Sequence, residues 1–105
     1  MSRARIRLPK DELARFANKW SIRELALFGS ALREDFGPES DVDVLASFVE
    51  GARWGLFDLV RMQEELAEIL GRGVDLVERE AIERSENYIR RRQILQSLEP
   101  VYVAR

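Results

Sequence analysis

Two aspartates inside an apolar run place the tightest limit on how this chain can fold. The run reads DVDVLASF over residues 41–48, with Asp41 and Asp43 one residue apart. On a β-strand, residues i and i+2 project from the same face with Cα atoms ~7 Å apart, whereas on a helix they would diverge. Two carboxylates on one face repel each other and lose hydration unless a cation lies between them. The run is therefore interpreted as a strand that holds a divalent metal ion at the edge of a sheet, although a solvent-facing edge strand stays open.

The rest of the chain alternates between helical and strand patterns. Apolar residues at helical spacing, together with capping signals, predict helices over residues 9–20, 30–35, 56–70 and 81–98. Short apolar runs bounded by glycine or polar residues predict strands over residues 23–28, 41–48 and 74–78. This order predicts an α/β (α+β) fold with a small mixed three-stranded sheet flanked by helices. With 105 residues, of which 46% are hydrophobic, the chain is expected to form one domain over residues 1–105.

A third aspartate is expected beside the first two. Asp75 lies early in the strand 74–78, and the chain before it is long enough for a strand–helix–strand crossover that returns parallel to its neighbour. Such a crossover would bring Asp75 next to Asp41 and Asp43. Three carboxylates from adjacent strands can coordinate two magnesium ions ~3.5–4 Å apart, an arrangement suited to phosphoryl or nucleotidyl transfer. A simpler interpretation, in which Asp75 caps the loop after Gly73, stays open.

A glycine–serine pair follows the first predicted strand. Only a short segment separates Gly29, at the end of the first strand, from Asp41, at the start of the second. If Gly29 and Asp41 bind the same ligand, the two strands are predicted to be antiparallel. A glycine lets phosphate approach the backbone, and a helix start offers N–H groups and the Ser30 hydroxyl to an anion. Ser30 could equally be only a helix N-cap. Arg33 is interpreted either as a phosphate contact or as the partner of a nearby acid.

The composition limits the chemistry and the partners. Cysteine and histidine are both absent, which excludes disulfides, thiolate nucleophiles and histidine bases. Catalysis would have to use carboxylates, hydroxyls and bound cations. A net charge of −2 gives no reason to expect nonspecific nucleic-acid binding, and the arginines at 90–92 would fan around a helix. No apolar run approaches a membrane span or a signal peptide, so a soluble cytoplasmic protein is expected.

The ordered motifs resemble those of a known family. GSALRED, SDVDVL and VDLV resemble the glycine–serine, Asp-x-Asp and third-aspartate pattern of minimal members of the DNA polymerase beta-like nucleotidyltransferase superfamily. The resemblance covers nearly the whole chain. It implies that Gly29 and Ser30 bind nucleotide phosphates and that Asp41 and Asp43 ligate two magnesium ions. It also implies that Asp75 is the third carboxylate and helps to activate the attacking hydroxyl.

The resemblance extends to a possible partner. Stand-alone minimal members are similar to the antitoxin halves of modules whose toxin is a helical HEPN-type ribonuclease, which implies transfer of AMP from ATP to a tyrosine of that toxin. No second domain is expected to hold the acceptor, and pairing of the chain with itself is left open. Arg33 matches the family pattern, whereas Glu34 stands where members often have glycine. The alternative is therefore a binding module with a weak or inactive site that neutralises a toxin by occlusion.

Overall fold

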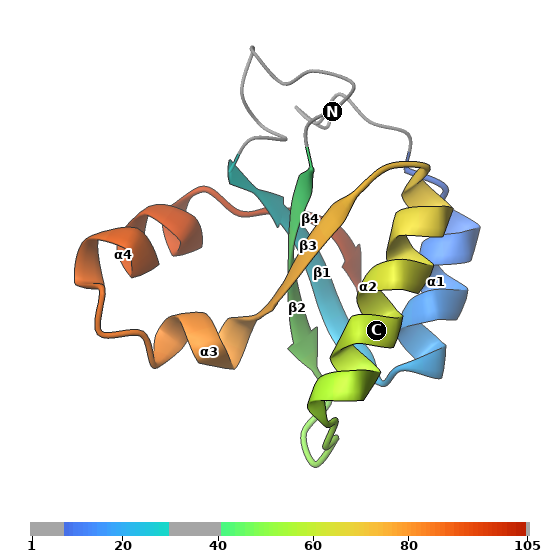
Figure 1. Ribbon diagram of the computed structural model, residues 1–105, viewed down its shortest axis with the longest axis horizontal. Coiled ribbons are helices and arrows are strands. Elements are labelled where there is room, and N and C mark those ends of the chain that lie inside the picture. The colour runs from blue at the N-terminus through green and yellow to red at the C-terminus, as the bar shows by residue number, and fades with distance from the viewer. Residues whose placement is uncertain (1–7, 30–40, 105) are drawn as a thin grey trace.

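A mixed sheet with helices on both faces forms the protein (Figure 1). The computed structural model describes residues 8–29 and 41–104, so the helix predicted over 30–35 lies outside the described residues. The helices are α1 (Lys10–Lys19), α2 (Leu56–Leu70), α3 (Arg79–Glu83) and α4 (Tyr88–Gln96). The strands are β1 (Ile22–Phe28), β2 (Val42–Phe48), β3 (Val74–Glu78) and β4 (Glu99–Val103). The predicted α/β class is confirmed.

The sheet has the order β3-β2-β1-β4. Strand β1 is antiparallel to β2 and to β4, while β2 and β3 are parallel, as predicted for the first three strands. The prediction of only three strands was wrong, because β4 joins the sheet beside β1. This strand is short and contains Pro100, which lacks a backbone N–H and is therefore confined to edge positions in sheets. Its sequence gives a weak strand pattern for that reason.

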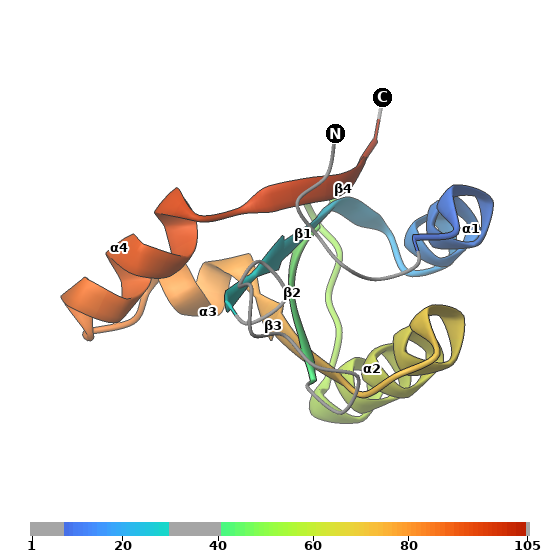
Figure 2. The ribbon, with the colours of Figure 1, turned by 90° about the horizontal axis from the view of Figure 1, so that it is seen from above.

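The sheet separates two apolar clusters. Helices α1 and α2 lie on one face, and α3 and α4 lie on the other (Figure 2). The larger cluster packs the sheet against α1 and α2, and its buried members include Leu13, Phe16, Leu25, Leu27, Val42, Val44, Met62 and Leu66. The smaller cluster on the opposite face consists of Phe28, Leu45, Ile82 and Ile94. Alternate residues of β2 therefore supply both cores, which is why its sequence is almost continuously apolar.

The single closing helix predicted over residues 81–98 was wrong. The structure has two short helices, because the chain leaves α3 after Glu83 and starts α4 at Tyr88. The Asn87 side chain accepts a hydrogen bond from the Arg90 N–H at 3.1 Å, and the Ser85 hydroxyl accepts one from the Asn87 N–H at 3.2 Å. Serine and asparagine side chains that bond nearby backbone in this way compete with a continuous helix.

Helix α2 has the predicted bounds, and both of its ends have a local cause. At its start the Gly55 N–H donates to the Asp58 carboxylate at 3.0 Å. At its end Gly71 adopts a left-handed conformation with φ 72°, and its N–H donates to the Ala67 carbonyl. Glycine is the residue that tolerates this conformation with least strain. No helix within residues 8–29 and 41–104 is long and apolar enough to cross a membrane.

Candidate functional site

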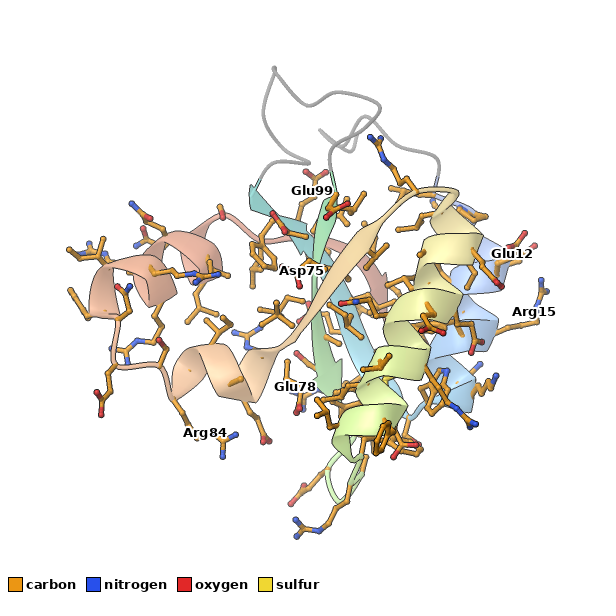
Figure 3. The ribbon with its side chains drawn as sticks, in the orientation of Figure 1. Glu12, Arg15, Asp75, Glu78, Arg84 and Glu99 are labelled. Atoms are coloured by element: carbon orange, nitrogen blue, oxygen red, sulfur yellow. The ribbon has the colours of Figure 1, made fainter. Side chains whose placement is uncertain are left out.

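Strand pairing places two of the predicted carboxylates side by side. Asp43 and Asp75 are direct register partners in the parallel pair of β2 and β3. Paired residues in a sheet project from the same face. Val42 and Val44, which flank Asp43 in the sequence, are buried on the side of α1 and α2. The two aspartates therefore leave the opposite face, and Figure 3 shows Asp75 on the side of β3 that is turned away from α2.

The end of β1 brings Gly29 to the same place. Phe28 is the register partner of Asp43, and Gly29 follows it with φ 66°. A Cβ atom at Gly29 would lie 3.3 Å from the Asp43 Cγ and would collide with one carboxylate oxygen. Both the backbone conformation and the lack of space therefore require glycine here. The predicted neighbourhood of Gly29 and the aspartates is present, although its nucleotide contact stays a prediction.

Gly73 is a residue of this region that the sequence alone did not reveal. Its carbonyl accepts the Val42 N–H at 2.9 Å, which starts the pairing of β2 with β3. A Cβ at Gly73 would lie 3.2 Å from the Asp41 Cγ and would collide with a carboxylate oxygen. Its φ is outside the left-handed region, so the Asp41 carboxylate, and not the backbone, requires glycine. The available signal was the spacing, because Gly73 precedes Asp75 by the same offset as Asp41 precedes Asp43.

Gln63 was also missed, because it lies on the long helix α2 and carries no motif. Its side-chain oxygen accepts the Leu76 N–H at 2.9 Å. Leu76 follows Asp75 directly, so this bond ties the outer side of β3 to α2 next to the exposed carboxylate. Gln63 therefore fixes the backbone that carries Asp75. Only the tertiary arrangement reveals this role.

The remaining predicted residues are not placed. Ser30 and Arg33 lie outside the described residues, as does Glu34. Within residues 8–29 and 41–104, no group of three or more histidine, cysteine, aspartate or glutamate side chains is arranged to hold a metal ion. The described structure thus gives the pairing of Asp43 with Asp75 and the contact of the Asp41 carboxylate with Gly73, and not a closed cluster of the three carboxylates.

The donor chemistry of this region fits magnesium. Carboxylate oxygens are the side-chain ligands that this small, hard cation prefers. The carboxylates of Asp41 and Asp43 occupy the spaces that side chains at Gly73 and Gly29 would fill, so the two glycines form a cradle for acidic groups. Asp41, Asp43 and Asp75 are the residues that would hold the metal.

Comparison with known proteins adds independent information. The family model of the nucleotidyltransferase domain matches residues 10–98. MJ0435 of Methanocaldococcus jannaschii, provisionally named a protein adenylyltransferase, is 41% identical over 59 residues, which cover 56% of this chain and 61% of that protein. The chain spans about three fifths of the length of the curated relatives that it matches.

Solved structures share the fold. A structure provisionally named a minimal nucleotidyltransferase is 26% identical, with a TM-score of 0.65 over 87% of both chains. A complex of a tri-AMPylated Shewanella oneidensis HEPN toxin with its MNT antitoxin gives a TM-score of 0.58 at 16% identity, covering 90% of this chain and 70% of that chain. At so low an identity, the second similarity shows the fold alone.

Proposed function

The chain belongs to the nucleotidyltransferase domain family, and from that membership we propose that it transfers AMP from ATP to a protein hydroxyl. The observation that carries the proposal is the pairing of Asp43 with Asp75 at the sheet end where β1 delivers Gly29. The adenylyl group is supported by the name of the relative MJ0435. A protein acceptor is supported by the AMPylated toxin in a complex of similar fold.

The acidic residues have distinct roles in this proposal. Asp41, Asp43 and Asp75 would hold two magnesium ions, which would neutralise charge on the polyphosphate and on the transferring group. Asp75 is exposed on β3 and accepts the proton of the attacking hydroxyl. As that proton leaves, a bond forms between the hydroxyl oxygen and the α-phosphorus, and the bond from that phosphorus to pyrophosphate breaks.

The nucleotide phosphates are proposed to bind at the end of β1. Gly29 has no side chain, so the end of β1 lies against the Asp43 carboxylate, and phosphates bound there would lie next to the acidic residues. Ser30 would donate its hydroxyl and Arg33 its guanidinium to the same phosphates. These contacts would hold the α-phosphorus against the aspartates, where proximity alone removes much of the activation barrier.

The acceptor that we propose is a tyrosine hydroxyl of a HEPN-type toxin. The solved complex of a tri-AMPylated HEPN toxin with an MNT antitoxin supports this choice of partner. AMP adds a large group with negative charge to the toxin, and this would block its activity. The chain would then act as the antitoxin of the pair.

The experiment combines the purified protein, magnesium, α-labelled ATP and a HEPN-type partner. Label is expected on a tyrosine of the partner, and Asp43→Asn or Asp75→Asn should slow its appearance by at least about 100-fold. Asp11→Asn, at an exposed position on α1, is the matched control and should transfer label normally. Absence of label with the wild-type protein contradicts the proposal. Full neutralisation of the toxin by the unlabelled Asp43→Asn mixture would establish occlusion instead.

A further inference from the structure

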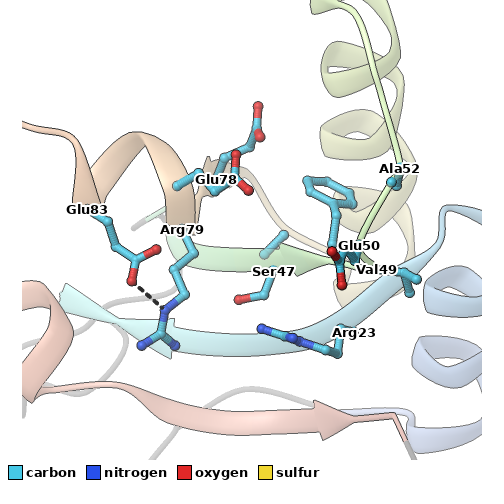
Figure 4. A pocket seen from close by; sticks show the side chains of 12 residues that line it. Arg23, Ser47, Val49, Glu50, Ala52, Glu78, Arg79 and Glu83 are labelled. Carbon is cyan, nitrogen blue, oxygen red and sulfur yellow. Dashed lines mark ion pairs between the residues drawn. The ribbon is translucent and has the colours of Figure 1, made fainter.

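A pocket lies at the end of the sheet opposite the aspartates. It has a volume of about 470 Å³ and is lined by the end of β2, the loop that follows it, and the start of α3 (Figure 4). Asp43 and Asp75 lie near the first residues of the parallel strands β2 and β3, whereas this pocket borders their last residues. The pocket is therefore separate from Asp43 and Asp75.

The floor of this pocket carries a buried hydroxyl with no hydrogen-bond partner among the described residues. Ser47 is 6% exposed, and its Oγ atom bonds to no group in the described part of the chain. Alanine at this position would avoid the cost of burying an unpaired hydroxyl. Figure 4 shows Ser47 between the side chains of Arg23 and Arg79. A hydroxyl and two guanidinium groups thus face one space.

The two arginines differ in their charge balance. Arg79 Nη1 lies 3.4 Å from Glu24 Oε1, and Arg79 Nε lies 3.6 Å from Glu83 Oε2. The charge of Arg79 is therefore compensated on two sides. Arg23 is exposed, lines the pocket and forms no ion pair with any described residue. It is the cation in this pocket that an incoming anionic group can neutralise.

Acidic residues occupy the remaining walls. Glu50, Glu78 and Glu80 line the pocket, and none of them forms an ion pair with another described residue. A simple anion bound at Arg23 would be repelled by these carboxylates. A simple cation bound at the carboxylates would be repelled by the guanidinium groups. Charges in such a partly enclosed space interact more strongly than in bulk water. A ligand that carries both a negative and a positive group can pair with Arg23 and with the glutamates at the same time.

We propose that this pocket binds a small zwitterion that carries a carboxylate and an ammonium group. The carboxylate accepts hydrogen bonds from the Ser47 hydroxyl and the Arg23 guanidinium, the two groups that have no side-chain partner among the described residues. The ammonium group lies toward Glu50 and Glu78. No covalent step is involved, and binding does not depend on ATP.

The test uses amino acids of increasing length, together with a simple carboxylate and a simple ammonium ion that each carry only one of the two charges. Glycine, β-alanine, 4-aminobutyrate and 5-aminovalerate are titrated into the 105-residue chain while backbone amide signals are followed by NMR. Saturable shifts are expected at Ser47–Ala52 and Arg79 for at least one of them, with a Kd of about 1 mM or lower. Butyrate and propylammonium, the halves of a zwitterion, should each bind at least about 10-fold more weakly. No saturable shift with any amino acid, or equal binding of a half, overturns the proposal.

Variants locate the ligand and separate this site from the aspartates. Ser47→Ala and Arg23→Gln should each weaken binding by about 5- to 10-fold, because each removes one hydrogen bond. Arg15→Gln, at an exposed position on α1, is the matched control for Arg23→Gln and should bind as the wild type does. Asp43→Asn should also bind normally, since it lies at the other end of β2. Unchanged binding in both pocket variants overturns the proposal, and thermal melting verifies that each variant is folded.

Discussion

Replacement of Gly73 by alanine tests the geometry of the aspartate region most directly. The added Cβ would lie 3.2 Å from the Asp41 Cγ and closer still to one carboxylate oxygen. Unstrained contacts between heavy atoms are about 3.5 Å or longer, so the carboxylate has to move by roughly 1 Å. The φ angle of Gly73 lies outside the left-handed region, so alanine meets no backbone strain.

The movement should affect stability and activity very differently. Asp41 is exposed, so its carboxylate can turn into water, and we expect the free energy of unfolding to change by less than about 1 kcal/mol. A misplacement of about 1 Å in a catalytic group can lower the rate about 100-fold, or about 2.7 kcal/mol of activation free energy. Gly73→Ala should therefore remain folded while it loses AMP transfer.

Gly71→Ala is the matched control for this experiment. Gly71 has φ 72°, and nothing lies within 4 Å of a Cβ built there. Alanine should lose about 1–2 kcal/mol of stability through backbone strain, while transfer by the folded protein stays unchanged. Urea unfolding and the initial rate of label transfer are measured for both variants. The reasoning is refuted if Gly73→Ala keeps its rate within about 3-fold of the wild type, or if both variants lose activity equally.

Three other changes test the packing around the site. Leu45→Ala should lower the free energy of unfolding by about 2–5 kcal/mol in urea, because Leu45 on β2 is fully buried in the cluster with Ile82 and Ile94; a loss below about 1 kcal/mol would mean that this cluster is loosely packed. Asn87→Ala removes the side chain that caps α4 and should weaken this helix by about 1 kcal/mol. Amide exchange should then quicken in α4 and not in the sheet, and equal quickening in both would contradict a local role. Gln63→Ala should cost about 1 kcal/mol and slow AMP transfer, because the Leu76 N–H beside Asp75 loses its acceptor. Gln93→Ala, at an exposed position on α4, is the control and should change neither stability nor AMP transfer. If the Gln63 variant were as active as the wild type, β3 would not need the Gln63 hydrogen bond.

Regular periodicity made much of the fold predictable. The helical spacing of the apolar residues from Leu56 to Leu70, followed by Gly71, predicted the bounds of α2 correctly. The length between the two aspartate strands correctly predicted a parallel crossover, which is what pairs Asp43 with Asp75. These features depend on local pattern and chain length, so a single sequence contains them.

Features that depend on tertiary contact were not predictable in the same way. The local sequence of Glu99–Val103 does not predict a strand. This segment becomes one by pairing with the edge of β1 in the folded protein. The break between α3 and α4 involves the side chains of Ser85 and Asn87, which form hydrogen bonds with nearby backbone N–H groups. Such bonds compete with a continuous helix, and the sequence alone does not show which of the two forms. Gly73 and Gln63 matter only because folding brings Asp41 and Leu76 to them. The proposed roles of Ser30 and Arg33 stay predictions.

The outermost strands of the sheet bear on how copies of this chain can assemble. On β3 the outward N–H of Leu76 is already occupied by Gln63, and on β4 Pro100 has no N–H to offer. A strand from a neighbouring molecule that paired with either edge strand would form fewer backbone hydrogen bonds than it would with an edge whose N–H groups are all available. The folded protein should therefore resist growth into extended cross-β aggregates. Association with other molecules is expected to use side-chain surfaces instead, such as those presenting Phe57 and Ile89, which are 86% and 68% exposed.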